Sequence, residues 1–338
     1  MIVHQVLSGA GPYDAVTRQA LAWRERFTAW GWEGADWAPF IDPRAGLGRR
    51  VRDLRGLAPT PADTLLLHYS AYAPRLRALL DTPARKVLLS HNVTPARWFW
   101  DHEPQVALQC ELGRRQLPEF AARCDAVAGV SAFNAAELGT DRVVPLLLDL
   151  PEASPDAAVP AGPPTVLFVG RLAPHKRQDE IIRAFALLRR HRVPDARLVL
   201  VGEPLHEAYH ERLRGLADTL VPGAVTFERS LDDGELAARY RAAHAFVCLS
   251  EHEGFCIPIL EAFAHGVPVV ARPRGAVAET AGDAALLLGG SLDAIAELLH
   301  LAIVDAELRA TLRARGRARL DAYRPTIAQD AMRALLEA

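Results

Sequence analysis

The sequence has few of the residues that build metal centres, cross-links or membrane spans. Only four of its 338 residues are cysteines, namely Cys110, Cys124, Cys248 and Cys256. Their positions show neither the CxxC spacing nor any related spacing of a metal site. We interpret them as small buried side chains in a reducing compartment. The amino end has no basic lead before an apolar stretch, and no apolar run approaches the ~18–20 residues needed to cross a bilayer. The expected location is cytoplasmic, with any membrane contact peripheral, at the inner face of the cell membrane.

An excess of one charge is also absent. The chain has 39 Lys and Arg residues against 41 Asp and Glu, a formal net charge of −2. No basic field is available to attract nucleic acid, so we expect no nucleic-acid partner. One local cluster is basic, and it contains Arg44, Arg49, Arg50, Arg52 and Arg55. It fits either a solvated loop or helix face, or a contact for an acidic or lipid-linked molecule, and the sequence leaves both open.

What the sequence does contain is a regular alternation of short apolar runs with longer amphipathic segments. Its length exceeds the usual single-core size of roughly 250–300 residues, which favours two domains. In the first part, strands are expected at residues 2–7, 64–69, 86–90, 126–130 and 143–148. Helices are expected from an N-cap at residue 14 to about residue 30, and at 73–80, 95–117 and 132–138.

A segment rich in Pro and Ala, residues 151–164, is interpreted as an interdomain linker. Strands are then expected at 165–169, 196–201, 225–227, 245–249 and 267–271. Helices are expected at 178–190, 205–220 and 233–242. A helical tail is expected from Ser291, with a break near residues 323–325. The pattern predicts an α/β protein with two doubly wound, Rossmann-like domains, residues 1–150 and 165–322, facing each other across a cleft. A last helix in residues 323–338 is expected to pack back on the first domain.

The segment 250–266 follows a buried strand and contains two acids, Glu253 in a loop and Glu261 in a helix. Pro258 suits the first turn of that helix, and Gly266 suits its left-handed end. Free N–H groups at a helix start attract an anion such as a diphosphate. Since α/β folds bind ligands at the carboxyl ends of their strands, we expect a ligand here.

A second loop of this kind begins at Gly170, where the strand 165–169 ends, and presents Arg171 and Lys176. Two cations in one loop suit a diphosphate leaving group. Lysine is rare in this chain, since Lys86 is the only other one, and a compact point charge at this place therefore indicates a function. A solvated surface cation is the alternative.

The first domain offers less specific candidates. The turn at residues 8–13 contains Gly9 and Gly11, which would let backbone approach a phosphate or sugar, although a plain strand–helix turn explains them equally. Asp14 is explained as an N-cap. His91 follows the strand 86–90 at its carboxyl end, where it is either structural or faces the cleft.

Taken together, Gly170, Arg171, Lys176, Glu253 and Glu261 resemble the donor site of retaining GT-B glycosyltransferases of family four, also called group 1. Other segments resemble the same family in the same order, over nearly the whole chain: 91–95, 130–134, 254–255, 266–270 and 275–279. The resemblance implies a GT-B fold and transfer of a hexose, with mannose and glucose types leading. The donor would be a GDP- or UDP-linked sugar, and the hydroxyl acceptor would belong to a glycan, polysaccharide, glycolipid or small molecule.

The resemblance also implies roles for the second-domain residues. Arg171 and Lys176 would bind the donor diphosphate, and Glu261, in the first turn of its helix, would accept hydrogen bonds from the ribose. Glu253 would contact hydroxyls of the sugar, helped by backbone N–H groups. Those N–H groups belong to Gly254, Phe255 and Cys256, and Arg229 would lie beside the base.

In the first domain, His91 would touch the sugar near the reacting centre, and the loop of Gly9 and Gly11 would approach the diphosphate or acceptor. The configuration at the anomeric carbon would be retained. The sequence lacks the Asp-x-Asp pair that holds a metal in the other major transferase fold, so the expected reaction needs neither metal nor cofactor. An epimerase or phosphorylase on the same fold and a non-catalytic scaffold are the alternatives.

Overall fold

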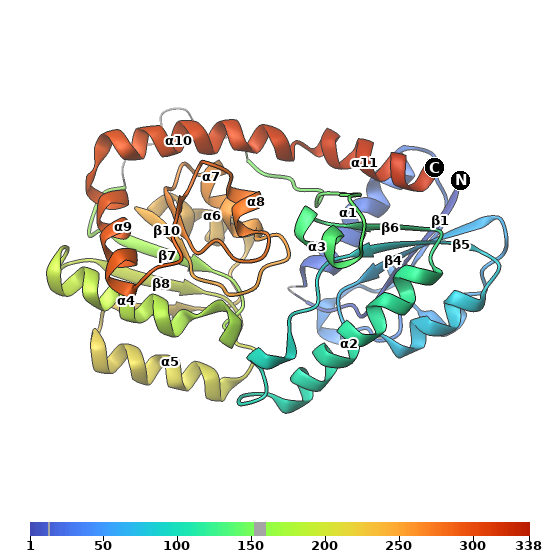
Figure 1. The fold of residues 1–338 in the computed structure, drawn as a ribbon, viewed down its shortest axis with the longest axis horizontal. Helices are drawn as coiled ribbons and strands as arrows, with labels where there is room; N and C mark the ends of the chain where they lie inside the picture. The colour runs from blue at the N-terminus through green and yellow to red at the C-terminus, as the bar shows by residue number, and fades with distance from the viewer. Residues whose placement is uncertain (13, 152–159) are drawn as a thin grey trace. The chain divides into compact units, whose positions relative to one another are not determined.

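The computed structural model describes residues 1–12, 14–151 and 160–338. The chain divides into two compact units, one formed by Met1–Leu148 with Tyr323–Ala338 and the other by Asp149–Ala322 (Figure 1). Tyr13 and most of the expected linker, residues 152–159, lie outside the described residues.

The first unit is built on a parallel sheet with the strand order β3-β2-β1-β4-β5-β6. Its strands are β1 (Ile2–Leu7), β2 (Asp36–Ala38), β3 (Val51–Asp53), β4 (Asp63–Tyr69), β5 (Arg85–Ser90) and β6 (Ala126–Gly129). Its helices are α1 (Ala15–Ala29), α2 (Pro104–Arg123), α3 (Ala132–Glu137) and α11 (Pro325–Glu337), with 3₁₀ turns η1 (Pro43–Ala45), η2 (Leu54–Gly56), η3 (Pro74–Asp81) and η4 (Ala96–Trp98). The central strand β4 is buried throughout and β1 over most of its length, and both are mostly apolar apart from polar residues that include buried Gln5 and His68.

Three expectations for this unit are wrong. The single helix expected at 95–117 is replaced by η4 and α2, because Pro104 starts a new helix. The helix α2 also ends later than expected, since it continues through Pro118 with Phe120 buried. The segment 73–80 is a 3₁₀ helix rather than an α-helix. Residues 143–148 form no strand and make only the bridge from Val143 to Gly129; the Gln19 side chain instead hydrogen-bonds both backbone groups of Leu147.

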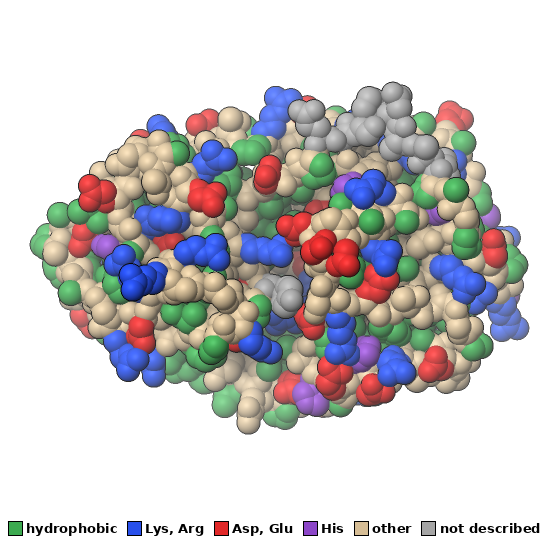
Figure 2. All heavy atoms as spheres, turned by 180° about the vertical axis from the view of Figure 1, so that it is seen from behind, with side chains coloured by type: hydrophobic (Ala, Val, Ile, Leu, Met, Phe, Trp, Pro, Cys, Tyr) green, Lys and Arg blue, Asp and Glu red, His purple; other side chains and the backbone are tan. Residues whose placement is uncertain are grey.

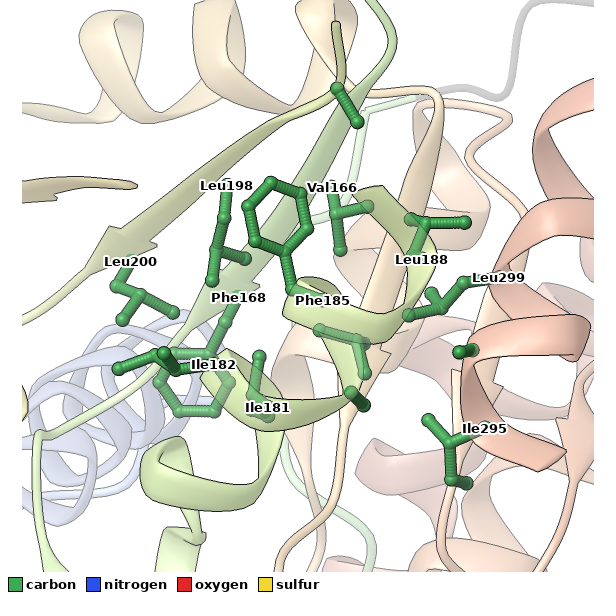
Figure 3. Close-up of a cluster of buried hydrophobic side chains, with 14 of the residues drawn as sticks. Val166, Phe168, Ile181, Ile182, Phe185, Leu188, Leu198, Leu200, Ile295 and Leu299 are labelled. Atoms are coloured by element: carbon green, nitrogen blue, oxygen red, sulfur yellow. The ribbon is translucent and has the colours of Figure 1, made fainter. Parts of the chain in front are cut away.

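The second unit repeats the topology of the first, with the order β12-β11-β10-β7-β8-β9. Its strands are β7 (Thr165–Val169), β8 (Arg197–Val201), β9 (Val225–Glu228), β10 (Ala245–Cys248), β11 (Val269–Ala271) and β12 (Leu286–Leu287). Its helices are α4 (Gln178–His191), α5 (Glu207–Leu220), α6 (Asp233–Ala242), α7 (Ile257–Ala264), α8 (Val277–Ala281), α9 (Leu292–Val304) and α10 (Ala306–Leu320). It also has the 3₁₀ turns η5 (Pro174–Lys176) and η6 (Asp321–Tyr323), and the last residue of η6 belongs to the first unit. Figure 3 shows its core, in which Phe185 and Leu188 of α4 meet Val166 of β7 and Leu299 of α9.

The helical tail ends in α11, which packs on the first unit. Arg85 donates hydrogen bonds to the carbonyls of Leu335 and Leu336, and the Arg333 guanidinium lies 4.3 Å from the centre of the Trp30 ring. These contacts place the last helix with the sheet formed by the start of the chain.

In each sheet the strand order reverses direction between two central neighbours, β1 and β4 in one unit and β7 and β10 in the other. The loops after such a pair diverge and leave a crevice where α/β proteins bind ligands. Figure 2 shows basic and acidic side chains interspersed over one face, in keeping with the small net charge. Among the described residues, no helix is long and apolar enough to span a membrane.

Candidate functional site

The loop after β7 contains the two cations predicted for the diphosphate. Gly170 ends the strand with φ 150°, and η5 then leads to Arg177, which has left-handed backbone and starts α4. The Gln178 side chain donates to the Arg171 carbonyl over 3.0 Å and so holds the loop against α4. Arg171 is exposed and Lys176 is half-buried.

The acidic loop after β10 is fastened from two sides. On one side the Glu251 amide donates to the His175 carbonyl over 2.8 Å, which ties this loop to η5. On the other side the Ala276 amide donates to the Glu253 carbonyl over 2.9 Å. Gly275 makes this approach possible, because a Cβ there would lie 2.3 Å from the Glu253 carbonyl oxygen. The backbone thus fixes the position from which the Glu253 side chain extends.

Lys176 and Glu253 meet at the crevice between β7 and β10. The Lys176 Nζ donates to both carboxylate oxygens of Glu253, each over 2.7 Å, and the Glu253 side chain is 9% exposed. Burial opposes the charge of Lys176, but the Glu253 carboxylate, together with Cys256 and Cys248, outweighs it and raises the pKa of Lys176 above its ordinary value. The site therefore holds a protonated amine against the Glu253 carboxylate at the switch point of the sheet.

The second acid, Glu261, is positioned by a residue that the sequence did not single out. Tyr240 of α6 donates from its hydroxyl to Glu261 Oε2 over 2.7 Å. Burial, followed by the nearby Glu261 carboxylate, raises the pKa of Tyr240 well above its ordinary value, so it remains a donor. Glu261 is the fifth residue of α7, so its expected place in the first turn is wrong. Cys256, with φ 74°, is the N-cap of this helix and makes no side-chain cap.

Arg229 follows β9, and its charge is engaged within the second unit. It donates to both carboxylate oxygens of Glu207, over 2.7 and 3.0 Å, and to His210 Nδ1 over 2.6 Å. Burial and the adjacent guanidinium lower the pKa of His210, in agreement with a neutral ring that accepts this bond. Arg229 therefore has partners on α5, and its predicted contact with a base stays a prediction.

In the first unit, His91 is the end of a chain of hydrogen bonds across β5, β4 and β1. Gln5 Nε2 donates to the Ala20 carbonyl and to Asp36, so Gln5 Oε1 accepts the bond of 2.9 Å from His68 Nε2. His68 Nδ1 must then accept the bond of 2.8 Å from His91 Nε2. His91 is left with Nδ1 as an acceptor. Burial lowers the pKa of His91 to about 3 and that of His68 well below its ordinary value, so both rings are neutral.

The glycine turn after β1 has a structural explanation. The Gly11 amide donates to the Thr17 hydroxyl, which itself donates to Asp14, the N-cap of α1. A Cβ at Gly11 would have nothing within 4 Å, and one at Gly9 would be 4.0 Å from the Phe40 carbonyl oxygen. Asp14 is confirmed as a cap. An approach of Gly9 and Gly11 to a phosphate stays a prediction.

The five arginines of the basic cluster are all exposed. Arg44 and Arg55 each pair with the aspartate two positions before them, Asp42 and Asp53, over 2.6 Å. The Arg52 guanidinium lies 5.5 Å from the centre of the Trp37 ring. The solvated interpretation therefore accounts for much of this cluster.

Comparison with known proteins identifies the family. Residues 151–319, which are 169 of the 338, match the family "Glycosyl transferases group 1". The chain belongs to the group 1 glycosyltransferases. Anabaena HepE, solved in complex with UDP-glucose, has the same fold, with a TM-score of 0.77, 20% identity, and coverage of 99% of this chain and 100% of that one. The GT-B architecture expected from the sequence, with its two parallel six-stranded sheets, is confirmed.

Two curated relatives show sequence similarity over part of their length. One is the GDP-mannose-dependent alpha-(1-6)-phosphatidylinositol monomannoside mannosyltransferase of Mycobacterium tuberculosis, 36% identical over 165 residues, which are 46% of this chain and 42% of that protein. The other is the D-inositol 3-phosphate glycosyltransferase of Acidothermus cellulolyticus, 31% identical over 290 residues, 69% of this chain and 63% of that protein. The chain thus matches less than half the length of the first and under two thirds of the second.

Proposed function

We propose that this chain is a retaining hexosyltransferase that takes its sugar from a nucleotide-diphosphate donor. The observation that carries the proposal is the contact of Lys176 with Glu253 at the crevice between β7 and β10. A cation and a carboxylate side by side suit a donor whose diphosphate is anionic and whose sugar offers hydroxyl groups. Family membership over 151–319 supports the same reaction class.

In this proposal Arg171 and Lys176 bind the diphosphate and stabilise the negative charge that develops as it departs. Glu253 accepts hydrogen bonds from sugar hydroxyls. It is not the covalent nucleophile, and a phosphate oxygen of the leaving group takes the acceptor's proton. When donor binds, Lys176 shares its hydrogen bonds between Glu253 and the diphosphate, so donor binding requires a partial opening of the ion pair.

The remaining donor contacts follow from the loop and helix after β10. Glu261, oriented by Tyr240, accepts hydrogen bonds from the ribose. Backbone amides of Gly254, Phe255 and Cys256 support the sugar, and the region of Arg229 lies near the base.

His91 receives a role that its hydrogen bonds define further. Its Nε2 is occupied by His68, so the neutral ring offers Nδ1 as an acceptor for a sugar hydroxyl. Because the pKa of His91 is about 3, this is a positioning role rather than acid catalysis at neutral pH. Loops of the first unit, including that of Gly9 and Gly11, select the acceptor.

For the donor we propose GDP-mannose first and UDP-glucose second. The first curated relatives carry names of GDP-mannose-dependent enzymes acting on a phosphatidylinositol mannoside, and HepE was solved with UDP-glucose. A glycolipid or polysaccharide acceptor follows from the same names. A lipid-linked acceptor would bring the chain to the inner face of the cell membrane.

The test is incubation of the full chain with a panel of GDP- and UDP-sugars, with and without lipid-linked or saccharide acceptors. We expect nucleotide release that depends on acceptor and a glycoside product with the donor's anomeric configuration by NMR. Sugar epimerisation without transfer, cleavage that requires phosphate, or absence of binding to every donor would each contradict the proposal.

A further inference from the structure

The fold brings together two cysteines that are eight positions apart in sequence. Cys248 ends β10 and Cys256 caps α7, and their Sγ atoms are 3.7 Å apart. Cys248 Sγ is also 3.9 Å from Glu253 Oε1. The three residues are buried, and their ligand atoms lie within 4.8 Å of one another. The sequence spacing gave no sign of a metal site, because the loop and the turn into α7, rather than a CxxC turn, make this approach.

We propose that Cys248, Cys256 and Glu253 form a binding site for a soft divalent cation such as Zn²⁺. Two Zn–S bonds of about 2.3 Å at the tetrahedral angle place the sulfurs about 3.8 Å apart, and a Zn–O bond of about 2.0 Å sets sulfur and oxygen about 3.5 Å apart. The observed distances of 3.7 and 3.9 Å are close to both values. Two thiolates and one carboxylate favour zinc over magnesium or calcium, and a water would complete the tetrahedron.

Binding of a divalent cation leaves the net charge of this buried site unchanged. Each thiol releases its proton to solvent, so two thiolate charges balance the two charges of the cation. The Glu253–Lys176 pair remains neutral as a whole, with Oε2 still available to Lys176.

The other two cysteines do not have these properties. Cys110 and Cys124 are packed against the apolar core of the first unit. Burial raises the pKa of both thiols, that of Cys124 to about 12. They fit the expected role of small apolar side chains. The hydrogen bond with Cys248, followed by burial, raises the pKa of Cys256 as well, so Cys248 and Cys256 differ from the other two by their geometry, with sulfurs 3.7 Å apart beside a carboxylate.

A bound cation would compete with the sugar donor, and this consequence rests on the proposed function. It would use Glu253, the residue proposed to contact sugar hydroxyls, and would fix Cys256, whose backbone amide is proposed to face the donor. The site would therefore make the transferase sensitive to free zinc, with inhibition reversed by a chelator.

The binding itself is tested without any assay of transfer. The full chain is reduced with a phosphine, freed of metal and titrated with Co²⁺, and the sulfur-to-cobalt charge-transfer absorption is followed. We expect this band in the wild type and its displacement by Zn²⁺. Loss of a group that only orients a metal ligand lowers metal affinity about 10–100-fold. Cys248→Ser removes a ligand itself, so Zn²⁺ binding should weaken at least ~10-fold. Cys256→Ser should do the same.

Two control variants locate the signal. Cys124→Ser removes a half-buried thiol elsewhere. His210→Ala disrupts the group of buried His210 with exposed Glu207 and Glu211, which has no sulfur. Both variants should keep the band. A wild type without the band, or a band that survives in both Cys248→Ser and Cys256→Ser, would overturn the proposal. The band with no transferase activity would leave the metal site standing and refute only the proposed function.

Discussion

Lys176 Nζ lies 2.7 Å from both carboxylate oxygens of Glu253, a residue 77 positions away on a different loop. Burial lowers the pKa of Lys176 and the Glu253 carboxylate raises it, with a net upward result. In Glu253→Gln the largest influence that raises this pKa is removed while burial remains, so the pKa of Lys176 should fall relative to the wild type.

Donor affinity should decrease as the pH rises and Lys176 loses its proton. In Glu253→Gln this decrease should occur at a lower pH than in the wild type. Donor binding measured by calorimetry from pH 6 to 10 (about the range in which a buried lysine titrates) checks this. The double variant Glu253→Gln with Lys176→Arg should lose the shift, because arginine stays protonated. Superimposable pH profiles for the wild type and Glu253→Gln would show that Glu253 does not set the charge of Lys176.

Tyr240→Phe removes the hydroxyl that donates to Glu261. A hydrogen bond to a charged group contributes about 1.5–3 kcal/mol, so the donor KM should rise about 10-fold or more while kcat changes less, because the ribose is remote from the reacting carbon. Steady-state kinetics give both constants. Tyr69→Phe is the matched control, since its buried hydroxyl bonds to Gly113 and Gln116 in the first unit. An unchanged KM in Tyr240→Phe would argue against the role of Glu261.

Gly275→Ala places a Cβ 2.3 Å from the Glu253 carbonyl oxygen at a residue with φ 58°. We expect a loss of stability above ~1 kcal/mol and weaker donor binding, because the acidic loop must shift. Gly215→Ala is the control: it lies within α5, nothing is within 4 Å of its Cβ, and it should stabilise by about 0.5–1 kcal/mol. Calorimetric unfolding compares the two, and equal melting temperatures would contradict the tight approach of Gly275.

The histidine chain should make the first unit sensitive to acid. His68 and His91 stay neutral in the folded state, whereas in the unfolded chain they gain protons as the pH falls below about 6.5. Stability is therefore fully present above pH 6.5 and is lost towards pH 3, by up to about 1.4 kcal/mol per pH unit for each ring.

Tryptophan fluorescence reports on this unit alone, because all six tryptophans lie between residues 23 and 100. Urea unfolding followed in this way should show a shallower loss of stability with acid for His91→Gln, which cannot titrate. An equal slope in the variant and the wild type would mean that His91 is protonated in the folded state.

The longer strands of the sheets were predicted well, because parallel strands covered on both sides are rich in apolar residues. Ile2–Leu7 and Thr165–Val169 were predicted with their observed ends. The short strands β2 and β3 were missed, since three residues that include Asp36 and Arg52 carry no apolar run.

The candidate site was predictable only where it repeats a family pattern. Lys176 and Glu253 were singled out, and the structure brings them into contact, but their pairing depends on the backbone at Gly275. Tyr240 and the sulfur pair could not be predicted, because each contact joins separate elements of the fold.

The central claim is that Lys176 binds the donor diphosphate, and the two lysines of the chain permit a direct test. Binding of the preferred nucleotide sugar should be measured by titration calorimetry for the wild type, Lys176→Met and Lys86→Met. Within the described residues, the Lys86 Nζ donates to the carbonyls of Thr82 and Ala84, in the first unit, and Lys86 serves as the control. The account predicts at least ~10-fold weaker binding for Lys176→Met, a loss of roughly 1.4 kcal/mol or more, and wild-type affinity for Lys86→Met. Equal affinity in all three proteins would contradict it.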